Sequence, residues 1–420
     1  MMKLNKLSSA LMVFAAVGVM ALPVSQAFAA PDQAKIAERK AKKSQAVGEK
    51  VGKAIGKAYE LYGQNKLNEA LALLTPLEPS AAFDRAYLYN FMGKLYAEKE
   101  PEKAISYLIK AMKEDVLSFN DQAGGLKLIG DLYLSNKKYQ EAISYYNKWS
   151  DFTGETDPNV DMRIANCYYE MKQYQKVIEP ADRAIAHFKA PRKEPYMMKV
   201  GSYYELKQPK KAIGVLETVV SVFPEEKSAW IQLANFYNLD EQYDRALAVM
   251  ELSYKQGFLT KENEIKLLAN LYVNNNIPYR AAEVLEKHLK SGLLKKERGV
   301  LSTIASSYSS ARNFEKAAEY YGMLGQMEND GEFYRRQGSA LLYANLNAEA
   351  VTALLKALEV GVKDKGKVHV DLISAYFYQG KMAEAYRQVE LARKNGQEKM
   401  AASWGPYVKE RAGKKGIKLN

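Results

Sequence analysis

The sequence predicts an all-α protein in which about ten helical hairpins stack into a solenoid. Residues 227–250 (KSAWIQLANFYNLDEQYDRALAVM) carry two apolar stripes of helical period, and a polar turn at 239–242 separates them. The same pattern recurs along the chain at intervals of 33 to 38 residues. No strand-like alternation and no Gly/Ser-rich linker interrupts it, so we expect one continuous domain.

A small residue in the second helix of each hairpin, here called the register residue, fixes the alignment of the repeats. The register residues are Ala70, Ala104, Ala142, Val177, Ala212, Ala246, Ala281, Ala317, Ala350 and Ala385. In most repeats a tyrosine stands nine residues earlier and a Gly or Ala twelve residues earlier, where two helices cross closely. Pro101, Pro209 and Pro278 stand three residues before their register residues, in the first turn of the second helix. This arrangement resembles the tetratricopeptide repeat (TPR), which implies a right-handed superhelix.

Residues 1–29 do not follow the repeat and have the organisation of a secretory signal peptide. Lys3 and Lys6 precede the apolar run 11–22, which is too short to span a bilayer. Ala27 and Ala29 offer small side chains at the positions that a signal peptidase reads. We expect cleavage after Ala29 and a soluble periplasmic protein; the alternative is a membrane anchor.

The predicted mature chain has three further parts. Residues 30–48 form a basic N-terminal arm, expected to be loose or weakly helical, and residues 49–397 form the repeat array. Residues 398–420 form a capping helix with a basic tail. The longest interval, 38 residues, lies between Ala104 and Ala142, and we expect its segment VLSFNDQAGG to form a protruding loop with a turn at Gly124 and Gly125.

The formal net charge is +12, and much of the excess lies near the two ends of the chain. Export makes a nucleic acid an improbable partner. The basic ends are therefore either solubilising caps of the solenoid or contacts for an anionic membrane surface. The two clusters are Lys35, Arg39, Lys40, Lys42, Lys43, Lys50, Lys53 and Lys57, and Lys409, Arg411, Lys414, Lys415 and Lys418.

The sequence offers little material for catalysis. The single cysteine, Cys167, excludes an internal disulfide and is interpreted as a packed apolar side chain. His187, His288 and His369 stand in separate repeats without metal-ligand spacing. We therefore expect no enzyme, no cofactor and no metal; a carbohydrate-processing enzyme would need an acid pair in the groove.

The candidate binding residues follow from repeat geometry. Positions one and four residues after the small residue of the first helix, and three before it, face the concave groove of a TPR stack. Amides there can bind the backbone of an extended peptide or helix, and aromatic side chains can add apolar contact. The alternative is that these positions make only solvated or inter-repeat contacts. The candidates are Asn166, Tyr169, Tyr204, Asn235, Asn238, Lys266, Asn270 and Arg335, with Asn274, Tyr343 and Tyr378 next to these positions.

Some of these residues resemble the clamp with which chaperone-binding TPR proteins hold a C-terminal carboxylate. Lys266 and Asn270 stand where the first Lys and Asn of that clamp would be, and Arg336 stands at its last Arg. Thr303 and Glu332 replace two other members. An acidic residue within the clamp disfavours capture of a dicarboxylate.

Several segments resemble a narrower family. The segments YNKWSDFTG, SAYFYQGK and SWGPYVKERAGKKGIKL are similar to periplasmic TPR proteins of gammaproteobacteria that are associated with TonB systems. That resemblance implies a non-catalytic scaffold accessory to ExbB/ExbD/TonB-type energy transduction for siderophore or haem uptake. A scaffold for envelope polysaccharide or outer-membrane assembly is the alternative.

Overall fold

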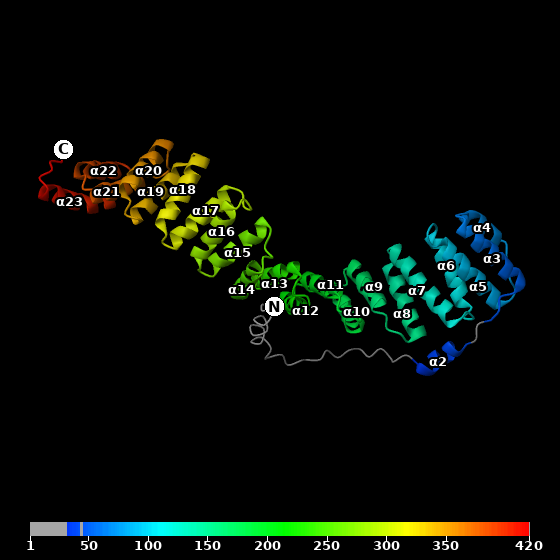
Figure 1. The fold of residues 1–420 in the computed structure, drawn as a ribbon. Coiled ribbons are helices and arrows are strands. Elements are labelled where there is room, and N and C mark those ends of the chain that lie inside the picture. The colour runs from blue at the N-terminus through cyan, green and yellow to red at the C-terminus, as the bar shows by residue number, and fades with distance from the viewer. Residues whose placement is uncertain (1–31, 43–44, 420) are drawn as a thin grey trace, which may run out of the picture. The chain divides into compact units, whose positions relative to one another are not determined.

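The computed structural model describes residues 32–42 and 45–419, and these residues form 22 helices and no strand (Figure 1). The all-α prediction is therefore confirmed. The helices alternate as first and second members of hairpins, here called helix A and helix B. The predicted signal peptide, residues 1–29, lies outside the described residues.

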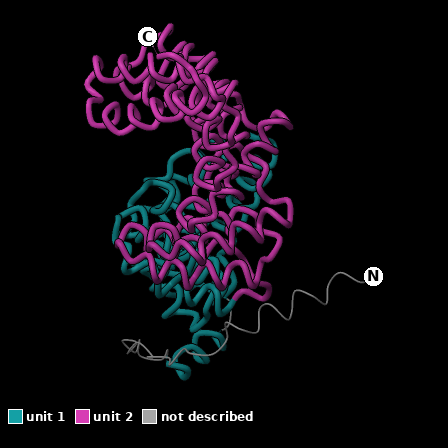
Figure 2. Tube along the Cα trace, turned by 90° about the vertical axis from the view of Figure 1, so that its left-hand side faces the viewer, with its two compact units in different colours: residues 1–187 teal, residues 188–420 magenta. Residues whose placement is uncertain are grey.

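The helices belong to two compact units (Figure 2). The first unit ends at His187 and the second begins at Phe188. The sequence led us to expect one continuous domain, because its helical periodicity continues through this boundary. The first unit contains α2 (Gln33–Ala41), α3 (Glu49–Gly63), α4 (Leu67–Leu74), α5 (Ala82–Tyr96), α6 (Pro101–Lys113), α7 (Phe119–Ser135), α8 (Tyr139–Thr153), α9 (Pro158–Glu170) and α10 (Tyr174–His187).

The second unit continues the alternation to the end of the described chain. Its helices are α11 (Lys193–Glu205), α12 (Pro209–Val222), α13 (Lys227–Leu239), α14 (Tyr243–Lys255), α15 (Glu262–Asn274), α16 (Pro278–Lys290), α17 (Arg298–Ser310), α18 (Phe314–Glu328), α19 (Gly331–Tyr343), α20 (Asn347–Val360), α21 (Lys365–Tyr378), α22 (Met382–Lys394) and α23 (Glu398–Lys414).

The close crossing of helices A and B explains the small residues. All ten register residues, Ala70 to Ala385, have an exposed fraction of 0%. On helix A, a Cβ added to Gly130 would lie 2.7 Å from the ring of Tyr146, and one added to Gly338 would lie 2.5 Å from Leu354. Only a residue without a side chain fits at those two crossings. As predicted, Pro101, Pro209 and Pro278 each occupy the first turn of a helix B.

The turn from helix A to helix B has one geometry in most hairpins. A residue with left-handed backbone stands five positions before the register residue, and the following N–H bonds to the carbonyl five residues back, as in Gln242 to Tyr237. Glycine fills this position only at Gly380; the other residues there are Asn65, Lys137, Lys172, Lys207, Glu241, Asn276, Arg312 and Asn345. The hydrogen bond therefore holds a conformation that L-residues otherwise avoid.

The prediction of a protruding loop between Ala104 and Ala142 is wrong, because the extra residues lengthen helix α7. Helix α7 begins at Phe119, and the side chain of Ser118 accepts a hydrogen bond from the N–H of Asp121 at 3.2 Å. Gly124 and Gly125 lie inside this helix, not in a turn. A Cβ at Gly125 would lie 2.5 Å from Met112, so this glycine permits a close helix contact.

The N-terminal arm packs against the third hairpin of the first unit. Ile36 of α2 is buried, and the Arg39 guanidinium lies 4.8 Å from the ring centre of Phe152. Arg39 also donates to the backbone oxygens of Asp151 and Phe152 at 3.1 and 3.0 Å. Contacts of this kind rest on cations and backbone oxygens, so an apolar pattern in the sequence does not reveal them.

Neighbouring repeats of the second unit are joined by a recurring polar contact. The helix-A tyrosine donates its hydroxyl proton to a glutamate on helix B of the preceding hairpin, in the pairs Tyr237–Glu217, Tyr272–Glu251 and Tyr308–Glu286. A basic residue directly before the register residue lies over the ring, as Arg245 does over Tyr237 and Lys316 over Tyr308. We call this set of tyrosine, glutamate and cation the inter-repeat triad.

The first prediction concerns the close crossing in α7. Gly130→Ala places a Cβ against the ring of Tyr146 and is expected to lower the free energy of unfolding by about 1–3 kcal/mol. Gly124→Ala is the matched control in the same helix, because no atom lies within 4 Å of its added Cβ. The control is expected to raise stability by about 0.5–1 kcal/mol. Urea unfolding followed by circular dichroism measures both; equal effects would contradict the packing argument.

The second prediction concerns the triad of Tyr308, Glu286 and Lys316. Burial opposes ionisation of Glu286, but hydrogen bonds from Lys290, Lys316 and Tyr308 outweigh it and lower its pKa to about 2. The carboxylate therefore stabilises the fold fully above its ordinary pKa of 4.5, and this contribution is lost as the pH falls toward 2.

Glu286→Gln removes that contribution, so the stability difference between wild type and variant should be largest near neutral pH and shrink below pH 4.5. Urea midpoints measured at neutral and acidic pH give the difference. Glu283→Gln, at an exposed carboxylate of the same helix, is the control and should show a smaller change. A difference that does not depend on pH would refute the role of Glu286.

Candidate functional site

The predicted groove residues are divided between the two units. Asn166 and Tyr169 lie on α9 of the first unit, and the other candidates lie on α11, α13, α15, α19 and α21 of the second. In both units they occupy helix A. The second unit therefore carries the larger part of the candidate site.

Helices α13 and α15 present the asparagines of the second unit. Asn235, Asn270 and Asn274 are exposed and Asn238 is half-buried. Among the described residues, none of these four side chains has a hydrogen-bond partner within the chain. The two hairpins are held in register at their turns, since Asn275 Nδ2 donates to the backbone oxygen of Tyr243 at 3.0 Å. Free amide groups on successive repeats leave both donors and acceptors available to a ligand backbone.

Two apolar residues lie beside these asparagines and were not among the predicted site residues. Leu239 is 58% exposed and Val273 is 41% exposed, so both side chains are accessible for apolar contact. Val273 stands four residues after the small residue Ala269, and Leu239 stands next to the equivalent position in its repeat. The position rule that selected Asn238 and Asn274 could therefore have found them. We call the six side chains of α13 and α15 at or beside the predicted groove positions the amide groove: Asn235, Asn238, Leu239, Asn270, Val273 and Asn274.

Lys266 and Arg335 do not offer free charge to a ligand. The Lys266 ammonium lies 2.5 Å from Glu262 and 3.7 Å from Glu297, and the carboxylate of Glu262 raises the pKa of this lysine. Arg335 donates two hydrogen bonds to Glu332, at 2.9 and 2.6 Å. Both cations are neutralised within their own helices.

The carboxylate clamp suggested by Lys266 and Asn270 is consequently not assembled. Glu332 also lies 3.4 Å from Arg336, the residue at the last position of the clamp. The hydroxyl of Thr303 donates to the backbone oxygen of Gly299 at 2.9 Å, so it adds no further donor. This arrangement fits a neutral backbone better than a terminal dicarboxylate.

The aromatic candidates are held by neighbouring rings and cations. Tyr169 packs edge-on against Tyr174 at 5.4 Å, and Tyr204 packs edge-on against Phe236 at 6.0 Å. Lys207 lies over the ring of Tyr204, which still remains 49% exposed. Tyr204 can therefore extend the apolar surface by contact from a fixed ring. Asn166 on α9 is half-buried and lies in the first unit.

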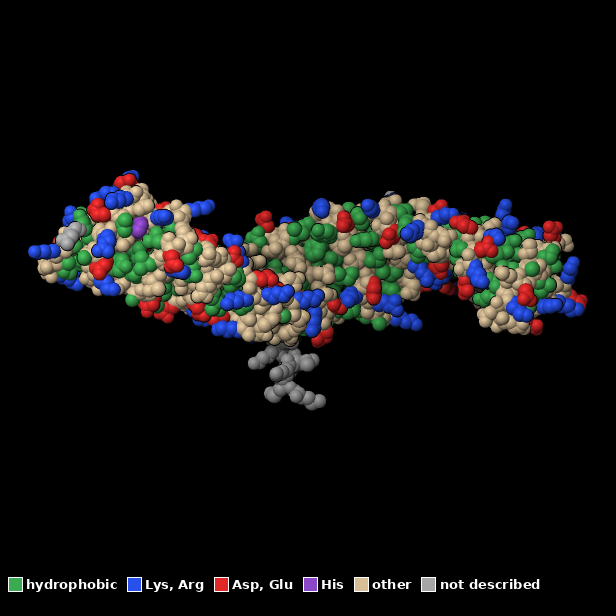
Figure 3. Space-filling view, turned by 90° about the horizontal axis from the view of Figure 1, so that it is seen from above, with side chains coloured by type: hydrophobic (Ala, Val, Ile, Leu, Met, Phe, Trp, Pro, Cys, Tyr) green, Lys and Arg blue, Asp and Glu red, His purple; other side chains and the backbone are tan. Residues whose placement is uncertain are grey.

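The basic clusters are partly occupied by contacts within the chain. Lys40 pairs with Glu155 at 3.7 Å, Lys53 with Glu49 at 2.5 Å and Lys414 with Glu410 at 2.6 Å. On the face that Figure 3 shows, Lys and Arg side chains are interspersed with acidic ones. Lys40, Lys53 and Lys414 are therefore paired with carboxylates of the chain itself.

The remaining candidates for chemistry behave as packing residues. Cys167 is buried, and burial raises the pKa of its thiol to about 12. His369 lies 2.7 Å from Gln388 in the interior. Within residues 32–42 and 45–419, no group of three or more His, Cys, Asp or Glu side chains could hold a metal ion. The described helices include none of the length and apolar character needed to cross a bilayer.

Comparison with known proteins agrees with the repeat geometry. A tetratricopeptide-repeat family model matches residues 128–148, which lie in the hairpin of α7 and α8. No curated protein sequence matches the chain. With its register residues, close crossings and repeated turns, the fold is an all-α TPR solenoid.

Solved structures resemble the chain at low sequence identity. The Naa15/Naa10 complex bound to HypK-THB has 14% identity and a TM-score of 0.45, and the match covers 86% of this chain and 68% of that one. The C-terminal part of a TPR protein from Cytophaga hutchinsonii has 19% identity and a TM-score of 0.36, with 58% and 98% coverage. YrrB, a TPR protein with an unusual peptide-binding site, has 16% identity and a TM-score of 0.34, with 46% and 94% coverage. At these identities the likeness concerns the fold alone.

Proposed function

We propose that this protein is a non-catalytic scaffold and that the amide groove of α13 and α15 binds an extended or helical segment of a protein partner. The observation that carries the proposal is the set of unpaired amides, repeated at the same place on successive repeats and bordered by exposed Leu239 and Val273. Amides bind a peptide backbone regardless of its sequence, and the apolar residues give a partner side chain a place to pack.

The proposal includes a cellular setting, which is supported by the sequence. Residues 3–29 have the organisation of a cleaved leader, and the C-terminal segment 403–419 resembles periplasmic TPR proteins associated with TonB systems. We place the scaffold in the periplasm as an accessory of TonB-dependent energy transduction. Its partner is then a component of an ExbB/ExbD/TonB-type complex.

Photocrosslinking in cells tests the setting and identifies the partner. With benzoylphenylalanine in place of Leu239, a crosslinked adduct with a TonB-system component is expected in the periplasmic fraction, on a chain beginning at Ala30. The same probe at Glu283, exposed on helix B of the following hairpin, is the control and should give no such adduct. An adduct with an envelope-polysaccharide or outer-membrane assembly protein would replace the TonB assignment, and a cytoplasmic chain would refute the setting.

The amide groove can be tested by the double substitution Asn235→Ala with Asn270→Ala. Exposed side chains contribute little to folding, so stability should change by no more than about 0.5 kcal/mol. Each lost hydrogen bond to the partner costs about 0.5–1.5 kcal/mol, so affinity for the crosslinked partner should fall about 5- to 150-fold.

Asn147→Ala is the matched control, because this exposed asparagine lies on helix B. Titration calorimetry and thermal melting on the same preparations separate binding from folding. If both variants bind like the wild type, the partner does not use the amide groove.

A further inference from the structure

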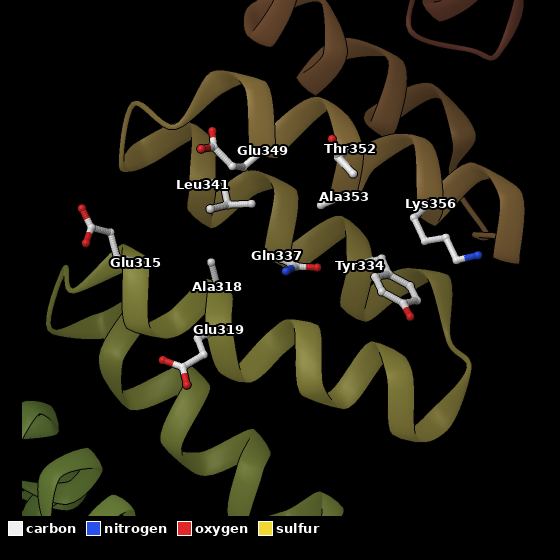
Figure 4. Close-up of a pocket in the computed structure, with 10 residues that line it drawn as sticks. All are labelled: Glu315, Ala318, Glu319, Tyr334, Gln337, Leu341, Glu349, Thr352, Ala353 and Lys356. Carbon is white, nitrogen blue, oxygen red and sulfur yellow. The ribbon is translucent and has the colours of Figure 1, made fainter.

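A cavity of about 490 Å³ lies on the second unit and is lined by residues of α18, α19 and α20 (Figure 4). Ala318 of α18, Leu341 of α19 and Ala353 of α20 form its apolar floor, and all three are buried. The rim is polar, and it includes the acidic residues Glu315, Glu319 and Glu349. Its volume is in the range of pockets that hold small ligands or side chains.

The cavity occurs where the inter-repeat triad is missing. Leu341 stands where the preceding repeats have the tyrosines 237, 272 and 308, nine residues before the register residue. Gly322 stands where they have the glutamates 217, 251 and 286. Both partners of the hydrogen bond are absent together, so neither is left buried and unpaired.

The third member of the triad has the opposite charge here. Glu349 directly precedes register residue Ala350, at the position that Arg245, Arg280 and Lys316 occupy in the earlier repeats. The repeat therefore lacks its internal cation and has a carboxylate at that place instead. A cation supplied from outside would restore the charge pairing that the other repeats make internally.

Two glycines of α18 allow polar side chains to line the cavity. The end of the Gln337 side chain lies 2.5 Å from a Cβ built at Gly322, and the ring of Tyr334 lies 3.0 Å from one built at Gly325. Gln337 and Tyr334 therefore lie close against α18, next to the floor residues (Figure 4). The Tyr334 side chain adds an aromatic surface to the cavity.

The carboxylates at the rim are not neutralised within the described chain. Glu315, Glu319 and Glu349 are exposed, and none makes an ion pair with another described residue. The cation of the rim, Lys356, lies 2.7 Å from Glu359. The cavity is thus acidic on a chain whose formal net charge is +12, which selects for a cationic occupant.

We propose that this cavity binds an arginine side chain of a protein partner. The aliphatic part of arginine would cover the floor of Ala318, Leu341 and Ala353, and its guanidinium would reach the carboxylates of Glu315, Glu319 and Glu349 at one end of the cavity (Figure 4). Arginine fits better than lysine because its planar group binds carboxylates in a bidentate way. This contact lies outside the amide groove, so a partner could engage both.

Titration calorimetry with an acetylated, amidated Gly-Leu-Arg-Leu-Gly peptide tests the proposal. Replacing its arginine by norleucine should weaken binding about tenfold or more, and lysine should give an intermediate affinity. Glu349→Gln in the protein should lower its affinity for the arginine peptide and leave its affinity for the norleucine peptide unchanged. Glu384→Gln is the matched control, because Glu384 also directly precedes a register residue, Ala385, and should bind like the wild type.

The triple variant Gly322→Glu, Leu341→Tyr and Glu349→Arg rebuilds the triad and should abolish binding of the arginine peptide. Glu349→Gln tests the same cavity if the triple variant does not fold. The double variant of Asn235 and Asn270 should bind this peptide normally, so failure of the amide groove and failure of the cavity are separable.

Three results would overturn the assignment. The first is the absence of saturable binding of the arginine peptide below about 1 mM, the range of a weak contact. The second is equal affinity for the arginine and norleucine peptides. The third is self-association that Glu349→Gln abolishes in analytical ultracentrifugation, because a second copy of the chain would then be the occupant.

Discussion

The close crossing of the two helices in each hairpin is the constraint on which the other features depend. In most hairpins a register residue with no exposed surface on helix B lies across from a Gly or Ala on helix A, and at Gly130 and Gly338 an added Cβ would meet the side chains of helix B. The crossing sets how far each helix A stands from its partner. It thereby determines which side chains reach the next repeat, such as the triad tyrosines, and which remain on the outer side of helix A, such as Asn235 and Asn270.

The repeat architecture could be predicted from the sequence because it depends on local periodicity and side-chain size. The register residues and the helix-B prolines are examples, since each is a property of one position. Contacts between residues distant in sequence were not predictable in this way. The packing of Arg39 on Phe152 and the close approach of Gly125 to Met112 depend on which segments meet after folding. For the site, the positions of the asparagines followed from the repeat, whereas the pairing of Lys266 and Arg335 with neighbouring glutamates required coordinates.

Many charged side chains of the second unit form ion pairs within the chain, and two surfaces that lack such pairs stand out. Glu286 is bonded to Lys290, Lys316 and Tyr308, and Glu332 serves both Arg335 and Arg336. Against this background, the amide groove is neutral and unpaired, and the cavity at α19 is acidic and unpaired. A scaffold that satisfies its own charges elsewhere leaves distinct chemistry on two sides of the same stack of helices, which favours specificity over general adhesion.

The repeated turn between helix A and helix B has a consequence for how this chain can change in length. The left-handed residue stands at one fixed distance from the register residue in nine hairpins, and the turn between α5 and α6 is the exception. In these nine hairpins the variation in repeat length is absorbed elsewhere, as α7 shows by its additional N-terminal residues. Insertions that arise in evolution, or tags introduced by engineering, are therefore best accommodated in the connection between one hairpin and the next. The turns between helix A and helix B keep a nearly constant length.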